Sequence, residues 1–558
     1  MELRSAVNFP QLIVAICNAM DLAAPAIYHH QMRTAYITKV LADDLTLPDA
    51  VKDQLLIAAL LHDIGALTPE EKVLIHQFEE VDTLSHCVKG EFILSCIPRL
   101  KPASLIVRHH HTTYKNLSDK KLALEENLLK AIQILFISDL TERKLDRNEY
   151  ILHQNSDVID DIKSSPHDML HPAVLETFMD VSRQDCFWLD MMNPNLPQKM
   201  LEALPPRNVD LLSEEFMQIA NIFGDIIDFR SSFTITHSTG VSECAARLAR
   251  LMGFSDAEVT LFEIAGKFHD LGKLKIPNYV LDKNGRLTKD EFQIIKQHTY
   301  FTHDLLSQID GLGPITPWAA YHHERLDGSG YPFHLSGDRL DLGARIMAVA
   351  DIFTALNEDR PYRKAMPRKD IEKFLKSLEA KNLIDATVLN VLMSNFEHIS
   401  KTVDKSQAKA KKFYITRFAS LLGDRSHLNM LVWDNKFSTG VRDIDEQRMA
   451  IINIMNALFA YLQGKEQRLT VIELLEDLEE LFLDYTELDH MILHEADDEK
   501  SFSYRKSNEH AMSTIKQIRA SAVADEFDAA LKTLKLLKKW WLAHVGKGDM
   551  EGLKAAAH

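Results

Sequence analysis

The 558-residue chain lacks most features that mark secreted, membrane-spanning or nucleic-acid-binding proteins. Its five cysteines are scattered without a CxxC pair, which argues against a disulfide framework and indicates a reducing compartment. Apolar runs such as residues 55–61 are too short to cross a bilayer, and the N-terminus lacks the basic and apolar segments of a secretion signal. The net charge of −17 argues against binding DNA, RNA or a membrane through a general basic field. We therefore expect a cytoplasmic protein without nucleic-acid or membrane partners.

The composition and length are those of a multidomain globular chain. Hydrophobic residues make up 46% and charged residues 26%, and chains of this length usually divide into domains of about 150–200 residues. Helical periodicity dominates throughout, which predicts an all-α fold. A Pro-rich stretch at 193–209 and a Lys-rich stretch at 401–427 are predicted linkers, and they separate helical domains at 1–192, 210–400 and 428–552.

The most informative pattern is a series of histidines and aspartates that occurs twice. In both copies the second histidine follows the first by 32 residues, the fourth follows the third by 24, and the last aspartate follows the final histidine by 28. Only the middle spacing differs, 24 residues against 29. Repeated spacing indicates a duplicated architecture. The first copy comprises His30, His62, Asp63, His86, His110, His111 and Asp139, and the second comprises His237, His269, Asp270, His298, His322, His323 and Asp351.

These residue types predict one metal centre for each copy. Neutral imidazoles and carboxylates are ligands of first-row transition metals. Burial in a core explains any single histidine, but not seven matched positions in two copies. Asp270 is expected to bridge two metals, because a carboxylate offers two oxygens whereas an imidazole offers one nitrogen. Two metals about 3.5–4 Å apart activate a water and clamp a phosphate, which suits phosphodiester hydrolysis.

The second copy lies within FEIAGKFHDLGKLKIP (262–277) and HHERLDGSGYP (322–332). From Asp228 to about Lys364 the chain resembles the HD-GYP family, bacterial phosphodiesterases that open cyclic di-GMP. The resemblance implies an all-helical domain whose metal ligands are the second copy, with two iron or manganese ions expected. It also implies that Asp270 and Lys273 are catalytic, and that Lys273, Tyr331, Arg360 and Arg363 contact the substrate. Phe233 stands where some members have a glutamate ligand for a third metal, so a binuclear site is expected.

The first copy resembles a general HD-domain phosphohydrolase and lacks the rest of the motif. Ala66 replaces the lysine of HDLGK, and the second histidine pair is followed by TTYKN without a GYP string. Three interpretations stay open: an active phosphomonoesterase, a metal-bound inactive relative, or a structural repeat. Our hypothesis is that this domain, holding two further metals, removes the 5′-phosphate of the product made by the second copy.

Residues 428–552 resemble bacterial hemerythrin, a four-helix bundle with a di-iron centre. The resemblance is incomplete, because Arg448 replaces the first histidine, His494 stands in the place of the bridging glutamate, and Lys506 replaces another histidine. A metal-free or weakly binding site is expected, in which Arg448 and Lys506 pair with Asp549. There are two alternatives. The bundle could serve in dimerisation, or it could hold one metal through some of the residues His490, His494, His510, His544 and Asp549.

Together these features predict a metal-dependent phosphodiesterase. It would hydrolyse a 3′,5′-cyclic dinucleotide, cyclic di-GMP or 3′3′-cyclic GMP-AMP, to the linear dinucleotide. One alternative is a non-catalytic cyclic-dinucleotide receptor, and the other is a nucleotide phosphohydrolase acting through the first copy. The sequence leaves a homodimer open.

Overall fold

The computed structural model describes most of the chain. The described residues are 6–23, 27–66, 71–72, 75–76, 83–118, 124–210, 212–229, 236–281, 283, 285–358, 364–422, 442–462, 470–493, 499–522 and 526–544. They form two compact units, residues 1–72 with 84–423 and residues 73–83 with 424–558. Helices are the dominant secondary structure of the described part and sheet is almost absent from it, which confirms the all-α prediction. Its only sheet has two strands of three residues each.

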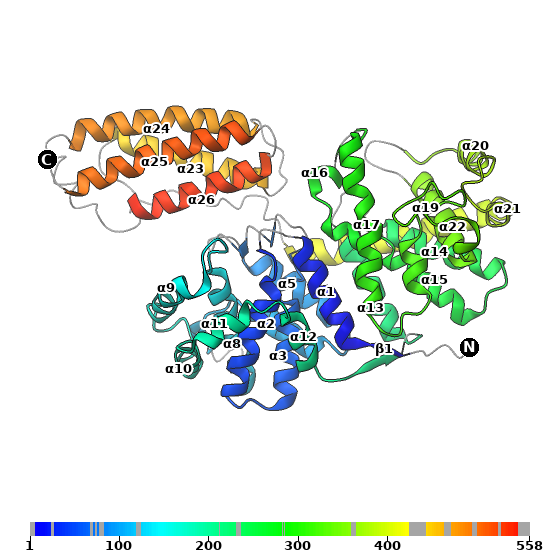
Figure 1. Cartoon of the computed structure of the whole chain (residues 1–558), viewed down its shortest axis with the longest axis horizontal. Coiled ribbons are helices and arrows are strands. Elements are labelled where there is room, and N and C mark those ends of the chain that lie inside the picture. Colours follow the sequence, from blue (N-terminus) through cyan, green and yellow to red (C-terminus); the bar gives the residue numbers. More distant parts are fainter. Residues whose placement is uncertain are drawn as a thin grey trace. The chain divides into compact units, whose positions relative to one another are not determined.

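The first copy occupies the N-terminal part of the larger unit (Figure 1). Helices α2, α3 and α8 pack together and enclose an apolar core that includes Leu41, Leu60 and Leu135. This core supports the residues of the repeat, which stand at helix ends or on inward faces. The helices are α1 (Phe9–Ala23), α2 (His30–Asp44), α3 (Asp49–Leu61), α5 (Thr83–Ser95), α6 (Lys101–His109), α7 (Tyr114–Leu117), α8 (Glu126–Arg143), α9 (Ile151–Lys163), α10 (Pro172–Val181), α11 (Asp185–Met191) and α12 (Leu196–Ala203).

The second copy follows in the same unit. Capping boxes fix the starts of two of its helices, through Ser255 with Glu258 and through Thr288 with Glu291, because each side chain satisfies a backbone N–H at the helix end. The elements are α13 (Glu214–Phe229), α14 (His237–Leu251), α15 (Asp256–Phe268), the 3-10 helix η2 (Leu271–Lys275), α16 (Asn278–Leu281), α17 (Lys289–Ser307), α18 (Ile315–Ala320), η3 (Gly337–Arg339), α19 (Leu342–Asn357), α20 (Arg368–Glu379) and α21 (Ala386–Ser394).

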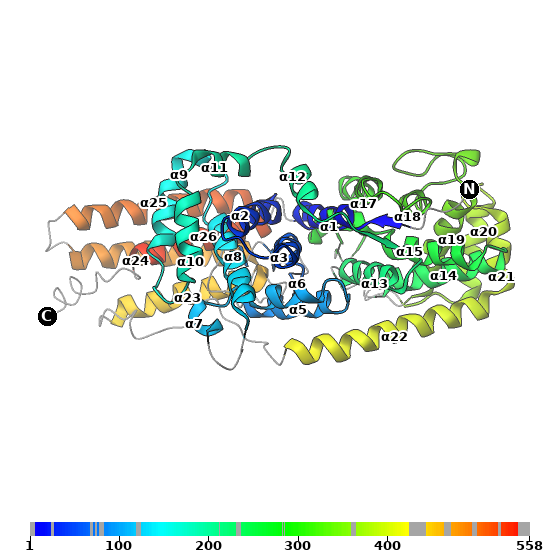
Figure 2. The same cartoon turned by 90° about the horizontal axis from the view of Figure 1, so that it is seen from below.

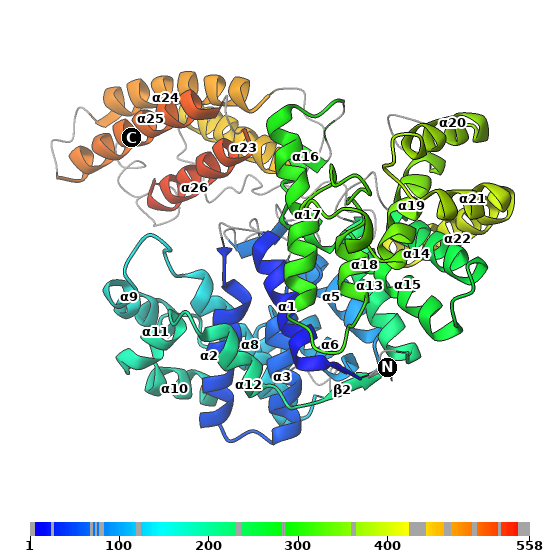
Figure 3. The ribbon, with the colours of Figure 1, turned by 45° about the vertical axis from the view of Figure 1, so that its right-hand side comes forward.

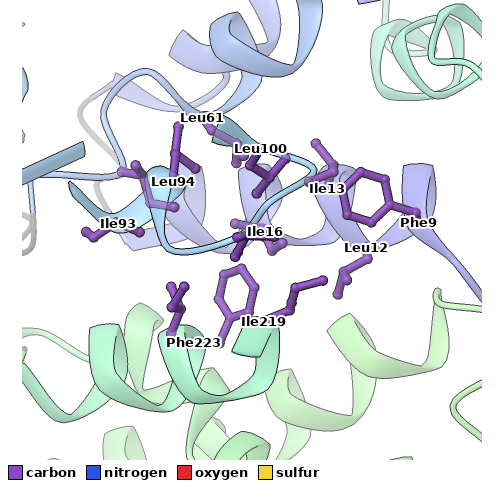
Figure 4. Close-up of a pocket in the computed structure, with 13 residues that line it drawn as sticks. Phe9, Leu12, Ile13, Ile16, Leu61, Ile93, Leu94, Leu100, Ile219 and Phe223 are labelled. Atoms are coloured by element: carbon purple, nitrogen blue, oxygen red, sulfur yellow. The ribbon is translucent and has the colours of Figure 1, made fainter. Parts of the chain in front are cut away.

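Helix α1 joins the two copies into one core. Strand β1 (Ala6–Asn8) pairs antiparallel with β2 (Asn208–Asp210), and α1 runs beside α17 (Figure 3). Figure 4 shows α1 side chains between residues of the first copy and α13 of the second. These side chains line an apolar pocket, and they include Phe9, Leu12, Ile13, Ile16, Leu61, Leu94, Ile219 and Phe223.

The two predicted linkers contain regular structure. Residues 193–209 include α12 and the start of β2. Residues 401–422 belong to α22 (Phe396–Leu422), a single helix of 27 residues that packs along α14 (Figure 2). The second stretch is therefore continuous with the HD-GYP-like domain up to residue 422.

The described residues of the smaller unit include four long helices: α23 (Arg442–Leu462), α24 (Val471–Leu493), α25 (Glu499–Ala522) and α26 (Glu526–His544). Each packs against the next, and α23 also packs against α26. Apolar residues at helical spacing form the interior, including Leu475, Phe482, Ile515 and Leu537.

The described residues also bear on membrane-spanning helices and on disulfides. Within them, no helix is both long and apolar enough to cross a membrane. None of the five cysteines forms a disulfide.

Candidate metal centres

The second copy brings its seven histidines and aspartates to one place. Six of the seven are buried, and His323 is partly exposed. They stand at the start of α14 (His237), directly after α15 (His269 and Asp270), within α17 (His298), just beyond the C-terminal cap of α18 (His322 and His323) and within α19 (Asp351).

The two carboxylate oxygens of Asp270 face different histidines. Its Oδ2 atom lies 3.1 Å from Nε2 of His269, and its Oδ1 atom lies 3.5 Å from Nε2 of His298. Asp351 completes the first group, because its Oδ1 atom lies 3.1 Å from Nε2 of His237. A bridging carboxylate between two metal positions requires this arrangement.

Backbone carbonyls one turn earlier hold the outer nitrogen of three histidine rings. Because a carbonyl can only accept, Nδ1 carries the proton, and Nε2 turns its lone pair toward the centre. Burial lowers the pKa of His298 to about 3, which favours the neutral form that a metal ligand needs. The bonds run from Nδ1 of His269 to Gly266 O at 2.8 Å, from Nδ1 of His298 to Ile295 O at 2.6 Å and from Nδ1 of His322 to Ala319 O at 2.7 Å.

The arrangement fits a pair of divalent metal ions. Among the described residues, the buried Nε2 atom of His269 has no partner with hydrogen-bond geometry. A buried polar atom without a partner is unfavourable, and a metal ion would satisfy it. The ligand atoms also form two groups in which all lie within 4.8 Å of one another, namely His237 with His269 and Asp351, and His298 with His322 and His323.

Lys273 lies at the edge of this centre, in η2. Its Nζ atom donates to Oδ2 of Asp270 at 2.6 Å. Burial alone would raise the pKa of Asp270, but His269 and Lys273 hold it well below its usual range. The lysine therefore supplies positive charge beside the predicted bridging carboxylate.

The GYP loop lies against the second group of ligands. The ring centroid of Tyr331 is 5.0 Å from that of His323, and the Tyr331 N–H donates to His323 O at 3.2 Å. The buried carboxylate of Glu324 accepts from the N–H of Phe333 at 2.7 Å and of Leu335 at 3.0 Å. Glu324, to which the sequence analysis gave no role, thus holds the loop in place.

Three residues considered in the sequence analysis lie outside the described residues: Phe233, Arg360 and Arg363.

The first copy assembles a matching centre. Oδ2 of Asp63 lies 3.5 Å from Nε2 of both His30 and His62, and its Oδ1 atom lies 3.6 Å from Nε2 of His86. Burial lowers the pKa of His86 to about 3 and that of His110 to about 4. The seven residues stand at the start of α2 (His30), after α3 (His62 and Asp63), within α5 (His86), after α6 (His110 and His111) and within α8 (Asp139).

The cation beside the first centre differs from that beside the second. Ala66, in the place of Lys273, is buried. Arg143, one turn after Asp139 on α8, instead places its Nη1 atom 3.5 Å from Oδ2 of Asp139. In the first copy the positive charge therefore comes from α8 and lies beside Asp139, whereas in the second copy it comes from η2 and lies beside Asp270.

Matched aspartates nine residues before the first histidine of each copy were missed as part of the repeat. The buried carboxylate of Asp228 accepts from the Ser238 N–H at 2.9 Å and from its hydroxyl at 2.8 Å. Asp21, also buried, accepts from the Gln31 N–H at 3.4 Å. Both fix the start of the helix that carries the first ligand, and their common spacing could have identified them.

Matched glycines allow the His-Asp turns to approach the helix that carries the third histidine. A Cβ atom on Gly272 would collide with the carbonyl oxygen of His298, and one on Gly65 would collide with that of His86. The glycines of HDLG and HDIG are therefore required by close packing.

The degenerate hemerythrin-like site is described only in part. The side chains of His490, His494, Lys506, His544 and Asp549 lie outside the described residues. Arg448 is 1% exposed, as expected for a cation inside the helices. His510 is exposed on α25, whose buried positions include Asn508, Ala511 and Ile515. His510, one of the residues from which the alternative metal site would draw its ligands, therefore lies off the packed face of α25.

Comparison with known proteins identifies both copies as HD domains. HD domain family models match residues 27–144 and 221–388. The chain is 28% identical over 403 residues to 3′3′-cGAMP-specific phosphodiesterase 1 of Vibrio cholerae, covering 70% of this chain and 92% of that protein. It is 42% identical over 143 residues to a cyclic di-GMP phosphodiesterase response regulator of Xanthomonas campestris, covering 25% of this chain and 37% of that one.

A solved structure of a cyclic GMP-AMP specific phosphodiesterase of V. cholerae shares the fold. Its TM-score is 0.51 at 20% identity, and the match covers 70% of this chain and 98% of that one. The chain contains two HD domains and, through the second, belongs to the HD-GYP family.

Proposed function

We propose that the second HD domain hydrolyses one phosphodiester bond of a 3′,5′-cyclic dinucleotide to give the linear dinucleotide. The observation that carries this proposal is the division of ligands around Asp270, whose two oxygens face separate histidine groups with Lys273 beside them. Two bound divalent metals would supply a nucleophilic water and stabilise charge on the phosphate. Iron or manganese suits this set of imidazoles and carboxylates.

The chain's own residues position and stabilise the substrate. The Lys273 ammonium, fixed by Asp270, is placed to stabilise negative charge that develops on the phosphate. The Tyr331 ring, beside His323, gives an aromatic surface for a base or ribose. Glu324 keeps this surface in place through its two backbone hydrogen bonds.

The relatives guide the choice of substrate. A relative matched over 92% of its length is named for 3′3′-cGAMP, whereas the relative with higher identity over a shorter stretch is named for cyclic di-GMP. We therefore assign 3′3′-cGAMP as the first substrate to test and cyclic di-GMP as the second.

The first HD domain is assigned to removal of the 5′-phosphate from the linear product. It retains the full ligand set and a nearby cation in Arg143, while it lacks Lys273 and the GYP loop. Removal of a terminal phosphate requires contacts to that phosphate, but it does not require a pocket that holds both nucleotides. A centre without the GYP loop therefore suits this reaction. Two further metals are assigned to this site.

Product chromatography on metal-reconstituted, full-length protein tests both assignments. We expect linear dinucleotide from the wild type and none from a His269→Ala/Asp270→Ala variant. A His62→Ala/Asp63→Ala variant should accumulate the 5′-phosphorylated dinucleotide. Binding of the cyclic dinucleotide without turnover, with both metals present, would favour a receptor and contradict the proposal.

A further inference from the structure

The two copies differ at the residue after the third histidine. The second copy has Thr299, whose hydroxyl donates to Lys296 O at 3.1 Å and so bonds within its own helix. The first copy has Cys87 at the same place, 2% exposed. A thiol thus replaces a hydroxyl directly beside the predicted metal ligands.

The sulfur of Cys87 lies among the histidine nitrogens. Its Sγ atom is 3.7 Å from Nε2 of His86 and 3.5 Å from Nδ1 of His110, and the Nε2 atoms of these two rings are 3.2 Å apart. With His111, these residues offer ligand atoms that all lie within 4.8 Å of one another. Atoms that coordinate the same metal ion lie at such distances from one another.

Two ring nitrogens in the same cluster have no hydrogen-bond partner within the part of the chain that the structure describes. Among the described residues, the buried Nε2 atom of His111 has no hydrogen-bond partner, and neither has the buried Nδ1 atom of His86. In the second copy, Nδ1 of His298 is instead held by Ile295 O. The His86 ring therefore lacks the carbonyl that orients its counterpart, and coordination would fix it instead.

We propose that Cys87 is a thiolate ligand of the metal held by His86, His110 and His111. The proposal rests on the assignment of a metal centre to the first HD domain. On binding, the thiol loses its proton to solvent as the sulfur–metal bond forms. Soft thiolate ligands favour zinc, whereas imidazole with carboxylate alone also suits iron and manganese. The two HD domains therefore differ in metal preference, with zinc favoured at this position of the first.

Cobalt(II) substitution of the full-length protein tests the ligand without relying on activity. A thiolate ligand gives a sulfur-to-cobalt charge-transfer band in the near ultraviolet. We expect this band in the wild type and its loss in Cys87→Thr, which installs the residue of the second copy. Cys186→Ser is the matched control, because Cys186 is exposed, and it should keep the band.

Zinc affinity gives a second, independent measurement. Cys87→Thr and Cys87→Ser should each weaken zinc binding at one site by at least tenfold, while circular dichroism verifies folding. A band that persists in Cys87→Thr, or a wild type that binds cobalt at this cluster without the band, would overturn the thiolate ligand. If instead the wild type holds no more cobalt than a His86→Ala/His110→Ala variant, the assignment of a metal centre to the first domain is itself contradicted.

Discussion

The Oε1 atom of Glu358 lies 3.0 Å from Nδ1 of His237, on the side of the ring opposite Asp351. Burial alone would lower the pKa of His237, but Glu358 and Asp351 raise it to about 10. The other oxygen of Glu358 accepts from Nε2 of Gln407 at 3.3 Å, and this amide also donates to Thr236 O at 3.2 Å. Helix α22 thus supports the first ligand through Glu358.

We expect Glu358→Ala to weaken metal binding at the second HD domain about 10–100-fold, because residues that orient a ligand contribute this much. Gln407→Ala should have a smaller effect in the same direction, since the bond from Glu358 to His237 remains. Competition with a chromogenic chelator measures both. Equal affinities for Glu358→Ala and wild type would show that this contact does not position His237.

Lys273→Ala should lower kcat on the cyclic dinucleotide about 10²–10³-fold, because a fixed donor to the developing charge is lost. Lys275→Ala is a matched control in the same 3-10 helix, since its Nζ atom lies 3.7 Å from the centroid of the Phe301 ring. Steady-state kinetics with metal content measured in parallel would separate charge from coordination. A loss of rate that follows lost metal would assign Lys273 to the support of Asp270.

The convergence of the predicted ligands was foreseeable from sequence because their spacing is repeated, and spacing survives where the intervening residues differ. All-helical structure was predictable from periodicity. The role of Glu324 was not predictable, because it accepts from backbone N–H groups 9 and 11 residues later in the chain. Asp21 and Asp228 could be recognised by their common spacing, but not the backbone N–H groups that they bind. Cys87 was considered only as a scattered cysteine, since its neighbourhood exists only once α5 and α6 are packed together.

The limits of the HD-GYP-like domain were harder to predict. The lysines of 401–412 suggested a linker, yet Val403 is buried, and Ser406 donates to Glu243 of α14 at 3.1 Å. A helix that packs on one side only can be mostly charged, so composition alone concealed its packed face.

Gly272→Ala and Gly65→Ala should each destabilise the domain that contains the substitution. The added methyl group collides with backbone carbonyl oxygens that cannot rotate away, and overpacking of this kind costs about 1–3 kcal/mol or more. Calorimetry and product analysis measure the effect. Gly65→Ala should impair removal of the 5′-phosphate and leave hydrolysis of the cyclic dinucleotide intact. Impaired hydrolysis of the cyclic dinucleotide in this variant would show that the domains depend on each other.

The metal-free protein should lose stability as the pH falls from about 6.5 toward 4. Burial lowers the pKa of His86 and His298 to about 3 and that of His110 to about 4, whereas a histidine in the unfolded chain titrates near 6.5. The unfolded state therefore binds protons that the native state does not. Each such histidine lowers the free energy of unfolding by up to about 1.4 kcal/mol per pH unit.

Groups shifted in the other direction do not reverse this expectation. His237, with its pKa raised to about 10, is protonated in both states below pH 6.5 and adds no slope there. Burial raises the pKa of Asp21 to about 7, so this carboxyl opposes the trend between about pH 7 and 4. Because more buried histidines have lowered pKa values, their effect should dominate. Urea unfolding with chelator at pH 6.5, 5.5 and 4.5 measures the slope, which His298→Asn should reduce, and an unchanged slope in that variant would contradict the assignment.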